Sequence, residues 1–325
     1  MRLPRGALLA VVATFMAVAP LRAQDAPLIV RGLRFKGNHA LDATQLSTAI
    51  ATTNSSWFAR AGMVRWMGLG EKRPFDQVEF ERDVLRVTLL YKKSGYMSVV
   101  VDTLVKRTPK DISITFLITE GLPVRLDSLT ILGLDSVAKP GAVTQDLPLR
   151  PGDPFNRILL DATSDTLVRR LRDRGYPDAI AFQSFERDKS ELAASAAIEL
   201  QTGPLSGVSG IGISGTKRIS PDVVRSLLAT RPGQQFSQEE LYRSQRNLYR
   251  SELFSFAAVS IDSAAYDPAS DSVPLTVRVT ESKPRRARGS VGYATEDCLR
   301  LGAGVTFRDF AGHGQILDVS GRLSK

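Results

Sequence analysis

The residues of this chain that could do chemistry are few and far apart. Its 325 residues contain two histidines, His39 and His313, and a single cysteine, Cys298. Neither histidine has a serine or cysteine partner at a spacing typical of nucleophilic catalysis, and no group of His, Cys, Asp and Glu has the spacing of a metal site. The lone cysteine rules out an internal disulfide bond. We therefore predict that the chain is not an enzyme and has no catalytic, metal-binding or cofactor-binding residue.

Two further motifs resemble chemical sites but have simpler interpretations. Residues 210–215, with the sequence GIGISG, look like a nucleotide-binding loop but lack the G-x-G-x-x-G spacing. Glu120 and Glu281 occupy the same place in two copies of a repeat, within TEG and TES. For these two acids we expect a hinge or capping contact rather than acid–base chemistry.

The elements around these residues occur in three copies. Each copy opens with a short apolar strand that ends at a glycine, and it then reaches a turn that contains a phenylalanine. The glycines are Gly37, Gly133 and Gly215, and the phenylalanines are Phe75, Phe155 and Phe236. A helical stretch and two strands follow, and each copy stops at a proline, namely Pro123, Pro204 or Pro284. Repeats of this size indicate an array of small domains.

The third copy shows the order of elements most clearly. Ser220 before Pro221 is typical of a helix start, and Ser237 with Glu240 three residues later predicts a capping box for a second helix. Alternating apolar residues follow and predict two strands. The order is strand, helix, helix, strand, strand, which gives an α+β fold. We predict domains at residues 28–122, 123–204 and 205–284, called repeats 1, 2 and 3.

Repeat 1 contains an insertion around residues 52–72. Gly37 and Phe75 are 38 positions apart, against 22 for Gly133 and Phe155. The extra stretch holds both tryptophans, Trp57 and Trp66. Two interpretations are open. The tryptophans could belong to a helix that packs on its own sheet, or they could contact a partner or a lipid surface.

The N-terminus and the charge point to an exported protein. Two arginines precede an apolar run of thirteen residues, Ala7–Ala19, which predicts a signal peptide over residues 1–23. The formal charge of +9 falls to about +6 without that segment, because residues 1–23 carry three arginines and no acid. Export argues against nucleic acid as a partner. One basic cluster, Arg169, Arg170, Arg172 and Arg174, is expected on a solvated helix face. A second, Arg285, Arg286 and Arg288, is placed where it could contact lipid phosphates.

Residues 285–325 have a different pattern. Short runs in which apolar residues alternate with small or polar ones are separated by turns rich in glycine and acids, as in a membrane β-barrel. Only two or three strands fit there, so we expect the start of a barrel and a truncated chain. Three strand–helix–helix–strand–strand repeats with RPGxxF, GY and TEGxP motifs resemble POTRA domains. With GYATEDCLRL and RDFAGHGQ behind them, the chain resembles the BamA/TamA family of outer-membrane insertases.

That resemblance implies a function without nucleotide, metal or other cofactor. Members of the family receive unfolded outer-membrane proteins in the periplasm and help them fold into the membrane. The implied partners are those clients, accessory lipoproteins and outer-membrane lipid. The implied location is the outer membrane, with the POTRA domains in the periplasm. Between the BamA-like and TamA-like roles the sequence does not choose.

The family's binding mode also implies particular residues. POTRA domains are thought to add a partner strand to a sheet edge, where backbone hydrogen bonds give affinity for many sequences. The expected edges are residues 98–104, 179–185 and 256–261. The expected partner-binding residues are Val99, Val101, Ile180, Phe182, Ala258 and Val259, with Trp57 and Trp66 in the insertion. The first barrel strand, residues 288–294, is expected to be the gate, with Ser290, Val291, Gly292 and Tyr293.

Two other classes of protein remain open. A two-partner-secretion transporter shares POTRA domains and a barrel but moves one dedicated passenger. A soluble periplasmic scaffold would have no membrane part. A pull-down that yields a single passenger favours the first, and a product found in the soluble periplasm favours the second.

Overall fold

The computed structural model describes residues 28–53, 74–188, 192–293, 300–310, 312 and 314–324. The chain divides into two compact units, and the boundary in the sequence lies between Leu122 and Pro123. The predicted signal peptide lies outside the described residues, and so do residues 54–72 of the predicted insertion, with both tryptophans. Within the described part of the chain, no helix is both long and apolar enough to cross a membrane.

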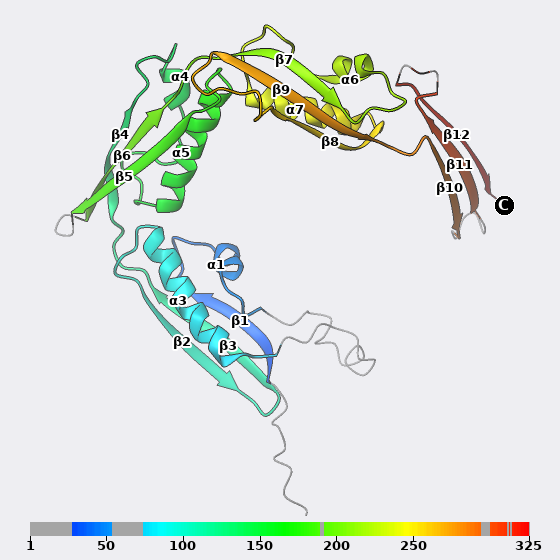
Figure 1. The fold of residues 1–325 in the computed structure, drawn as a ribbon. Coiled ribbons are helices and arrows are strands. Elements are labelled where there is room, and N and C mark those ends of the chain that lie inside the picture. Colours follow the sequence, from blue (N-terminus) through cyan, green and yellow to red (C-terminus); the bar gives the residue numbers. More distant parts are fainter. Residues whose placement is uncertain are drawn as a thin grey trace, which may run out of the picture. The chain divides into compact units, whose positions relative to one another are not determined.

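The first unit contains one three-stranded sheet with helices against it (Figure 1). Its elements are β1 (Ile29–Lys36), α1 (Ala43–Ala49), α3 (Gln77–Lys93), β2 (Val100–Arg107) and β3 (Asp111–Thr119). The sheet order is β1-β3-β2, so the last strand is central. It pairs in parallel with β1 and antiparallel with β2.

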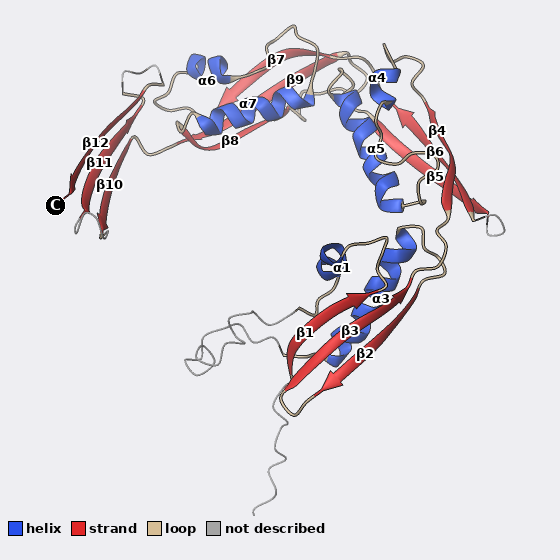
Figure 2. Ribbon diagram, turned by 180° about the vertical axis from the view of Figure 1, so that it is seen from behind, coloured by secondary structure: helices blue, strands red, loops and turns tan. Residues whose placement is uncertain are grey.

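The second unit repeats this arrangement twice (Figure 2). Repeat 2 has β4 (Arg125–Leu132), α4 (Gly141–Thr144), α5 (Arg157–Arg172), β5 (Ile180–Asp188) and β6 (Ala193–Gln201). Repeat 3 has β7 (Gly207–Ser214), α6 (Pro221–Leu227), α7 (Gln238–Arg250), β8 (Phe254–Ile261) and β9 (Ser272–Glu281). The sheet orders are β4-β6-β5 and β7-β9-β8. The predicted α+β fold with three β-α-α-β-β repeats is therefore confirmed.

The core of each repeat lies between the central strand and the helices. Along β3, alternate residues are buried, and the same holds for β6 and β9. In repeat 1 the buried cluster joins Leu46 of α1, Val87 and Tyr91 of α3 and Phe116 of β3. Because strand side chains alternate between faces, one face of each sheet is covered by helices. We call the other face the open face.

Side-chain caps start the helices where the sequence indicates. The hydroxyl of Ser220 accepts a hydrogen bond from the backbone N–H of Asp222, ahead of Pro221 in the first turn of α6. The hydroxyl of Ser237 accepts from the N–H of Glu240 at 3.4 Å. The Glu240 carboxylate is paired with Arg243 at 3.0 Å. The N-cap of α7 is thus confirmed, but the predicted capping box is only half formed, because the Glu240 side chain pairs with Arg243 instead of the backbone N–H of Ser237.

A glycine follows the first strand of every repeat, where the backbone of the central strand comes very close. A Cβ on Gly37 would lie 2.1 Å from the carbonyl oxygen of Ile118. The corresponding approaches are 2.0 Å for Gly133 and 1.9 Å for Gly215. All three glycines have positive φ, between 81° and 90°. No other residue fits without displacement of the backbone.

In each repeat, a buried polar side chain of the second helix binds the backbone of the connection between the first and second helices. Asp83, Thr163 and Ser244 each lie eight positions after the repeat's phenylalanine, and none has an exposed side chain. They accept hydrogen bonds from the backbone N–H groups of Ala51, Leu149 and Ala229 at 2.8–3.1 Å. Burial opposes ionisation of Asp83, but hydrogen bonds from Thr52, Ala51 and Arg86 outweigh it and lower the pKa of Asp83.

A fourth sheet follows repeat 3. It consists of β10 (Arg285–Gly292), β11 (Arg300–Arg308) and β12 (Ile316–Ser324), all antiparallel in the order β10-β11-β12. The predicted two or three strands are therefore three. Their lengths of eight or nine residues are close to the 9–11 residues that cross a bilayer as a tilted strand.

The close approach at the glycine after each first strand gives the first testable prediction. Gly215→Ala should destabilise repeat 3 by at least about 3 kcal/mol, because backbone strain and a clash with the Val279 carbonyl add together. Gly233→Ala is the matched control, since Gly233 also has positive φ but has open space around it, so it should cost only about 1 kcal/mol. Hydrogen exchange of β9 in the full chain measures both. Equal losses of protection in the two variants would contradict the prediction.

Candidate functional site

Each of the three repeats leaves one antiparallel strand at the sheet margin. β2, β5 and β8 each pair with the central strand on one side. Among the described residues, no strand pairs with the other side of any of them. These are the strands that the sequence predicts as edges, with limits of residues 100–107, 180–188 and 254–261 in place of the predicted 98–104, 179–185 and 256–261. Their outer backbone groups are open to an added strand.

The open face beside these edges carries exposed apolar side chains. On β5, Ile180 is 42% exposed and Phe182 is 53% exposed. The residues that alternate with them along β5 face the helices: Gln183 donates a hydrogen bond to the Asp161 carboxylate, and Phe185 packs on Phe155 with their ring centres 5.1 Å apart. Val100 and Leu104 of β2 and Phe256 of β8 are exposed in the same way. A partner strand added at such an edge would find apolar contacts on one face only.

The predicted partner-binding residues divide into two groups. Ile180 and Phe182 are exposed, and Ala258 is half-buried on the open face of β8. Val99 and Val259 are buried, and Val101 packs against the core of its own repeat. At these three positions only the backbone remains for a partner. Trp57 and Trp66 lie outside the described residues.

The exposed residues that the sequence prediction missed are Val100, Leu104 and Phe256. Strand side chains have a period of two, so a choice displaced by one position selects the core face. The signal that could have found them is the alternation in residues 99–105, where the valines at 99, 101 and 105 form one apolar set and Val100 and Leu104 belong to the other.

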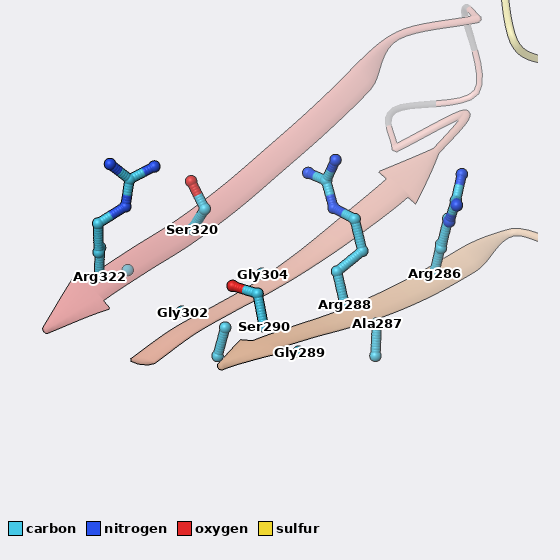
Figure 3. A pocket seen from close by; sticks show the side chains of 11 residues that line it. Arg286, Ala287, Arg288, Gly289, Ser290, Gly302, Gly304, Ser320 and Arg322 are labelled. Carbon is cyan, nitrogen blue, oxygen red and sulfur yellow. The ribbon is translucent and has the colours of Figure 1, made fainter. Parts of the chain in front are cut away.

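The fourth sheet has one polar face. Arg286, Arg288 and Ser290 of β10 point to the same side as Ser320 and Arg322 of β12 (Figure 3). Gly302 and Gly304 lie between them and leave a shallow hollow that these side chains line. Arg288 forms an ion pair with Asp318 at 2.5 Å, and Asp318 also accepts a hydrogen bond from Thr306. Long charged side chains therefore lie across this face.

The opposite face of the same sheet is apolar and exposed. Leu301 and Val305 of β11 share it with three residues of β12, namely Leu317, Val319 and Leu323. Val319 is 57% exposed and Leu323 is 75% exposed. In a water-soluble protein the apolar face of a sheet is normally covered by other elements, whereas here it is exposed. We call this arrangement reversed polarity.

The predicted gate residues lie at the margin of this sheet. Ser290, Val291 and Gly292 pair with Gly302, Leu301 and Arg300, and Tyr293 follows the strand. The predicted strand limits of residues 288–294 need correction, because β10 begins at Arg285 and ends at Gly292. Arg285 and Arg286, which precede the predicted start, are already paired with β11 as part of the strand.

The first arginine cluster is not a solvated face. Arg170 donates to the carbonyl oxygens of Val143 and Gln145, and Arg174 donates to that of Ala142. These oxygens lie in and just after α4, where a helix end leaves carbonyl groups without partners. The expectation of a solvated cluster was therefore wrong for these arginines, which fasten α4 to α5.

The two repeated glutamates make the expected capping contacts. Glu120 accepts hydrogen bonds from the backbone N–H groups of His39 and Ala40 at 2.7 and 2.8 Å, and from the hydroxyl of Tyr91. Burial and this hydrogen bond raise the pKa of Tyr91. His39 is thus part of the turn that Glu120 holds. Thr202 occupies the equivalent position in repeat 2.

Glu281 holds the same turn in repeat 3 more extensively. One carboxylate oxygen accepts from the N–H groups of Lys217, Arg218 and Ile219 at 2.7–2.9 Å, and the other pairs with Arg218 at 3.0 Å. Arg218 also donates to the carbonyl of Ser282. Burial works against ionisation of Glu281, but these N–H groups and the Arg218 charge outweigh it, so the pKa of Glu281 lies below its usual value.

Within the second unit, repeats 2 and 3 share backbone and side-chain contacts. The N–H of Ser206 donates to the carbonyl of Gly175 at 2.7 Å. Asp173 accepts from the N–H of Glu239 at the start of α7. The hydroxyl of Tyr266, in the long loop between β8 and β9, donates to Asp178.

The repeats and the sheets define a POTRA-domain protein. A family model described as "POTRA: Surface antigen variable number repeat" matches residues 28–121 and 207–282. These ranges make up more than half of the chain, which therefore belongs to this family. Repeat 2 lies outside both matches but has the same sheet order as its neighbours.

Similarity to curated proteins narrows the family to BamA/Omp85. The chain is 23% identical over 303 residues to the outer membrane protein assembly factor BamA of Neisseria meningitidis serogroup B, covering 91% of this chain. It is also 23% identical over 307 residues to a candidate outer membrane protein assembly factor of Treponema pallidum. The chain spans about a third of the length of these relatives, with 36% and 35% covered. It is a BamA/Omp85-family protein.

Solved structures show the same fold. POTRA domains 3–5 of BamA from Haemophilus influenzae match with a TM-score of 0.50 and 18% identity, covering 79% of this chain and 97% of that one. BamA from Haemophilus ducreyi lacking POTRA domains 1–3 matches with a TM-score of 0.54 and 19% identity, covering 62% of this chain and 37% of that one.

The Glu281 contacts predict a pH dependence of repeat 3. Because the folded pKa of Glu281 is lowered, its contribution to stability is present above the unfolded pKa of about 4.3 and is lost as the pH falls through the folded pKa. Glu281→Gln should therefore weaken hydrogen-exchange protection in repeat 3 most at neutral pH.

The difference between wild type and Glu281→Gln should shrink below about pH 4. Glu239→Gln is the control, because Glu239 forms an exposed pair with Arg246 and such pairs contribute about 0–1 kcal/mol. A difference for Glu281→Gln that stays constant from neutral to acid pH would contradict this account.

Proposed function

We propose that this chain is the periplasmic arm and the first membrane strands of an outer-membrane insertase, which receives unfolded β-barrel proteins and assists their folding and insertion. The single observation that carries the proposal is the reversed polarity of the fourth sheet directly after three POTRA repeats. An exposed apolar face beside a polar one is what a strand between lipid and an aqueous lumen requires. The similarity to an assembly factor named BamA supports the same reading.

In this proposal the mature chain has four parts. After a signal peptide at residues 1–23, POTRA domains occupy residues 28–122, 123–204 and 205–284, and barrel strands begin at residue 285. The POTRA domains lie in the periplasm and the strands lie in the outer membrane. No covalent step is involved, so the protein acts by binding and by offering strand templates.

The edges of β2, β5 and β8 receive the client. Backbone groups at such an edge bind an extended segment whatever its sequence, which suits a protein with many clients. The exposed apolar residues of the open face add a preference for one kind of client strand. A strand that alternates apolar and polar residues can place its apolar side chains beside Phe182 and its polar ones on the side of Gln183 and Asp161. Membrane barrel strands have this alternation.

The margin of the fourth sheet serves as the gate. Among the described residues, the outer side of β10 has no strand partner, so Ser290, Val291 and Gly292 offer free backbone groups there. A client strand that pairs with β10 would continue both faces of the sheet, polar next to Ser290 and apolar next to Val291. Accessory lipoproteins and lipid are further partners in this proposal.

The edge of β5 provides a binding test. Phe182→Asp in the full chain should weaken binding of a peptide with alternating apolar and polar residues by roughly tenfold, because partial burial of a phenylalanine contributes about 1–1.5 kcal/mol. Ser184→Asp adds the same charge two residues along the same open face and is the matched control. Titration of a fluorescent peptide measures both. Equal weakening by the two variants would show that charge, not the apolar contact, matters.

Depletion of the full-length gene product tests the function itself. An insertase serves many clients, so several unrelated β-barrel proteins should decline together in the outer membrane, measured by quantitative proteomics of membrane fractions. Restoring the wild-type gene is the control. Loss of a single secreted passenger with an unchanged set of barrel proteins would favour a two-partner-secretion transporter instead.

A further inference from the structure

One arginine and two phenylalanines lie at the end of the fourth sheet's apolar face that is nearest in sequence to repeat 3. Arg285 lies directly opposite Phe307 in the register of β10 and β11. Its guanidinium stands over the Phe307 ring, 5.8 Å from the ring centre. Phe310 meets Phe307 edge-on at 6.4 Å and is 62% exposed. We call these three residues the Arg285 corner.

Strand alternation separates Arg285 from the arginines that follow it. Arg286 and Arg288 point to the polar face, and Ala287 points to the other side (Figure 3). Arg285 therefore shares the apolar face with Ala287 and Val305. Arg288 has a carboxylate partner in Asp318, whereas no ion pair to Arg285 occurs among the described residues. An exposed cation without a counter-ion thus stands at the margin of an apolar surface.

This placement suits the boundary between acyl chains and headgroups. A long basic side chain at the edge of an apolar surface keeps its stem in the apolar region and its charge in the polar one. Aromatic residues gather at the same level in membrane barrels. The contact with Phe307 keeps the guanidinium beside an aromatic ring, and the planar guanidinium can donate to two phosphate oxygens at once.

We infer that the Arg285 corner binds lipid phosphate groups of the leaflet that faces repeat 3. The inference rests on the proposed membrane location of the fourth sheet and adds a specific ligand and residue to it. It assigns the contact to one of three neighbouring arginines: Arg285 meets the headgroups, and Arg286 and Arg288 belong to the polar face.

Vesicle flotation with the full chain tests this assignment. The vesicles contain phosphatidylcholine with phosphatidylglycerol, and parallel vesicles contain a galactolipid without phosphate. Arg285→Gln should weaken partition onto the phospholipid vesicles by about fivefold, the effect typical of one basic residue near an anionic surface. Arg286→Gln removes the same charge one residue away on the other face and should leave partition unchanged. Arg285→Lys keeps the charge without the planar fork and should lose less than Arg285→Gln.

The outcomes distinguish this inference from the proposed function. If wild type floats with both kinds of vesicle and Arg285→Gln matches Arg286→Gln, the Arg285 assignment is wrong while the membrane location stands. An equal loss for Arg285→Gln on the galactolipid vesicles also overturns it, because no phosphate is present there. Wild type that floats with neither overturns the membrane location and the inference with it. Excess inorganic phosphate at constant ionic strength should not release the wild type, and release would indicate a free-anion site instead.

Discussion

Each repeat depends on a long-range contact: its first strand pairs in parallel with its last. The last strand thereby becomes central, as in the order β1-β3-β2. Where the first strand ends, a carbonyl oxygen of the central strand occupies the place of a side chain, so a glycine is required there. The same topology moves the fourth element to the margin. The open edges of β2, β5 and β8 therefore follow directly from the strand order of the repeats.

The repeats differ in how strongly they hold the connection before the second helix. Thr163 and Ser244 provide one accepted hydrogen bond each, whereas Asp83 provides a carboxylate that binds Ala51, Thr52 and Arg86. The connection after Ala51 is also the longest, with 24 positions to Phe75 against 6 from Leu149 to Phe155. A longer connection costs more entropy to close. The strongest acceptor thus lies at the start of the longest connection.

The sequence predicted the local elements well because their signals are local. Ser220 and Ser237 start helices as their patterns indicate, and the glutamates of TEG and TES make capping contacts. The strand order was not predictable in this way, since it depends on residues that are far apart in sequence. The face of an edge strand was missed for a related reason. Val99, Val100 and Val101 are chemically alike, and only the register against β3 decides which of them is exposed. The bonds of Arg170 and Arg174 to α4 were missed because a carbonyl acceptor leaves no mark in the sequence.

The fourth sheet has the same alternation as the other three but opposite exposure. In β9 the apolar set Val273, Leu275 and Val277 is buried under helices. In β11 and β12 the apolar set is exposed. The polar face of the sheet carries the ion pair between Arg288 of β10 and Asp318 of β12, and small residues beside long charged side chains. Alternation alone therefore predicts a strand but not its surroundings. What distinguishes the two cases is the length of the connections: only residues 293–299 and 309–315 join β10 to β11 and β11 to β12, which is too short for a covering helix as long as α5, so the apolar face must find another cover. The hydrocarbon of a bilayer can cover such a face without any additional helix.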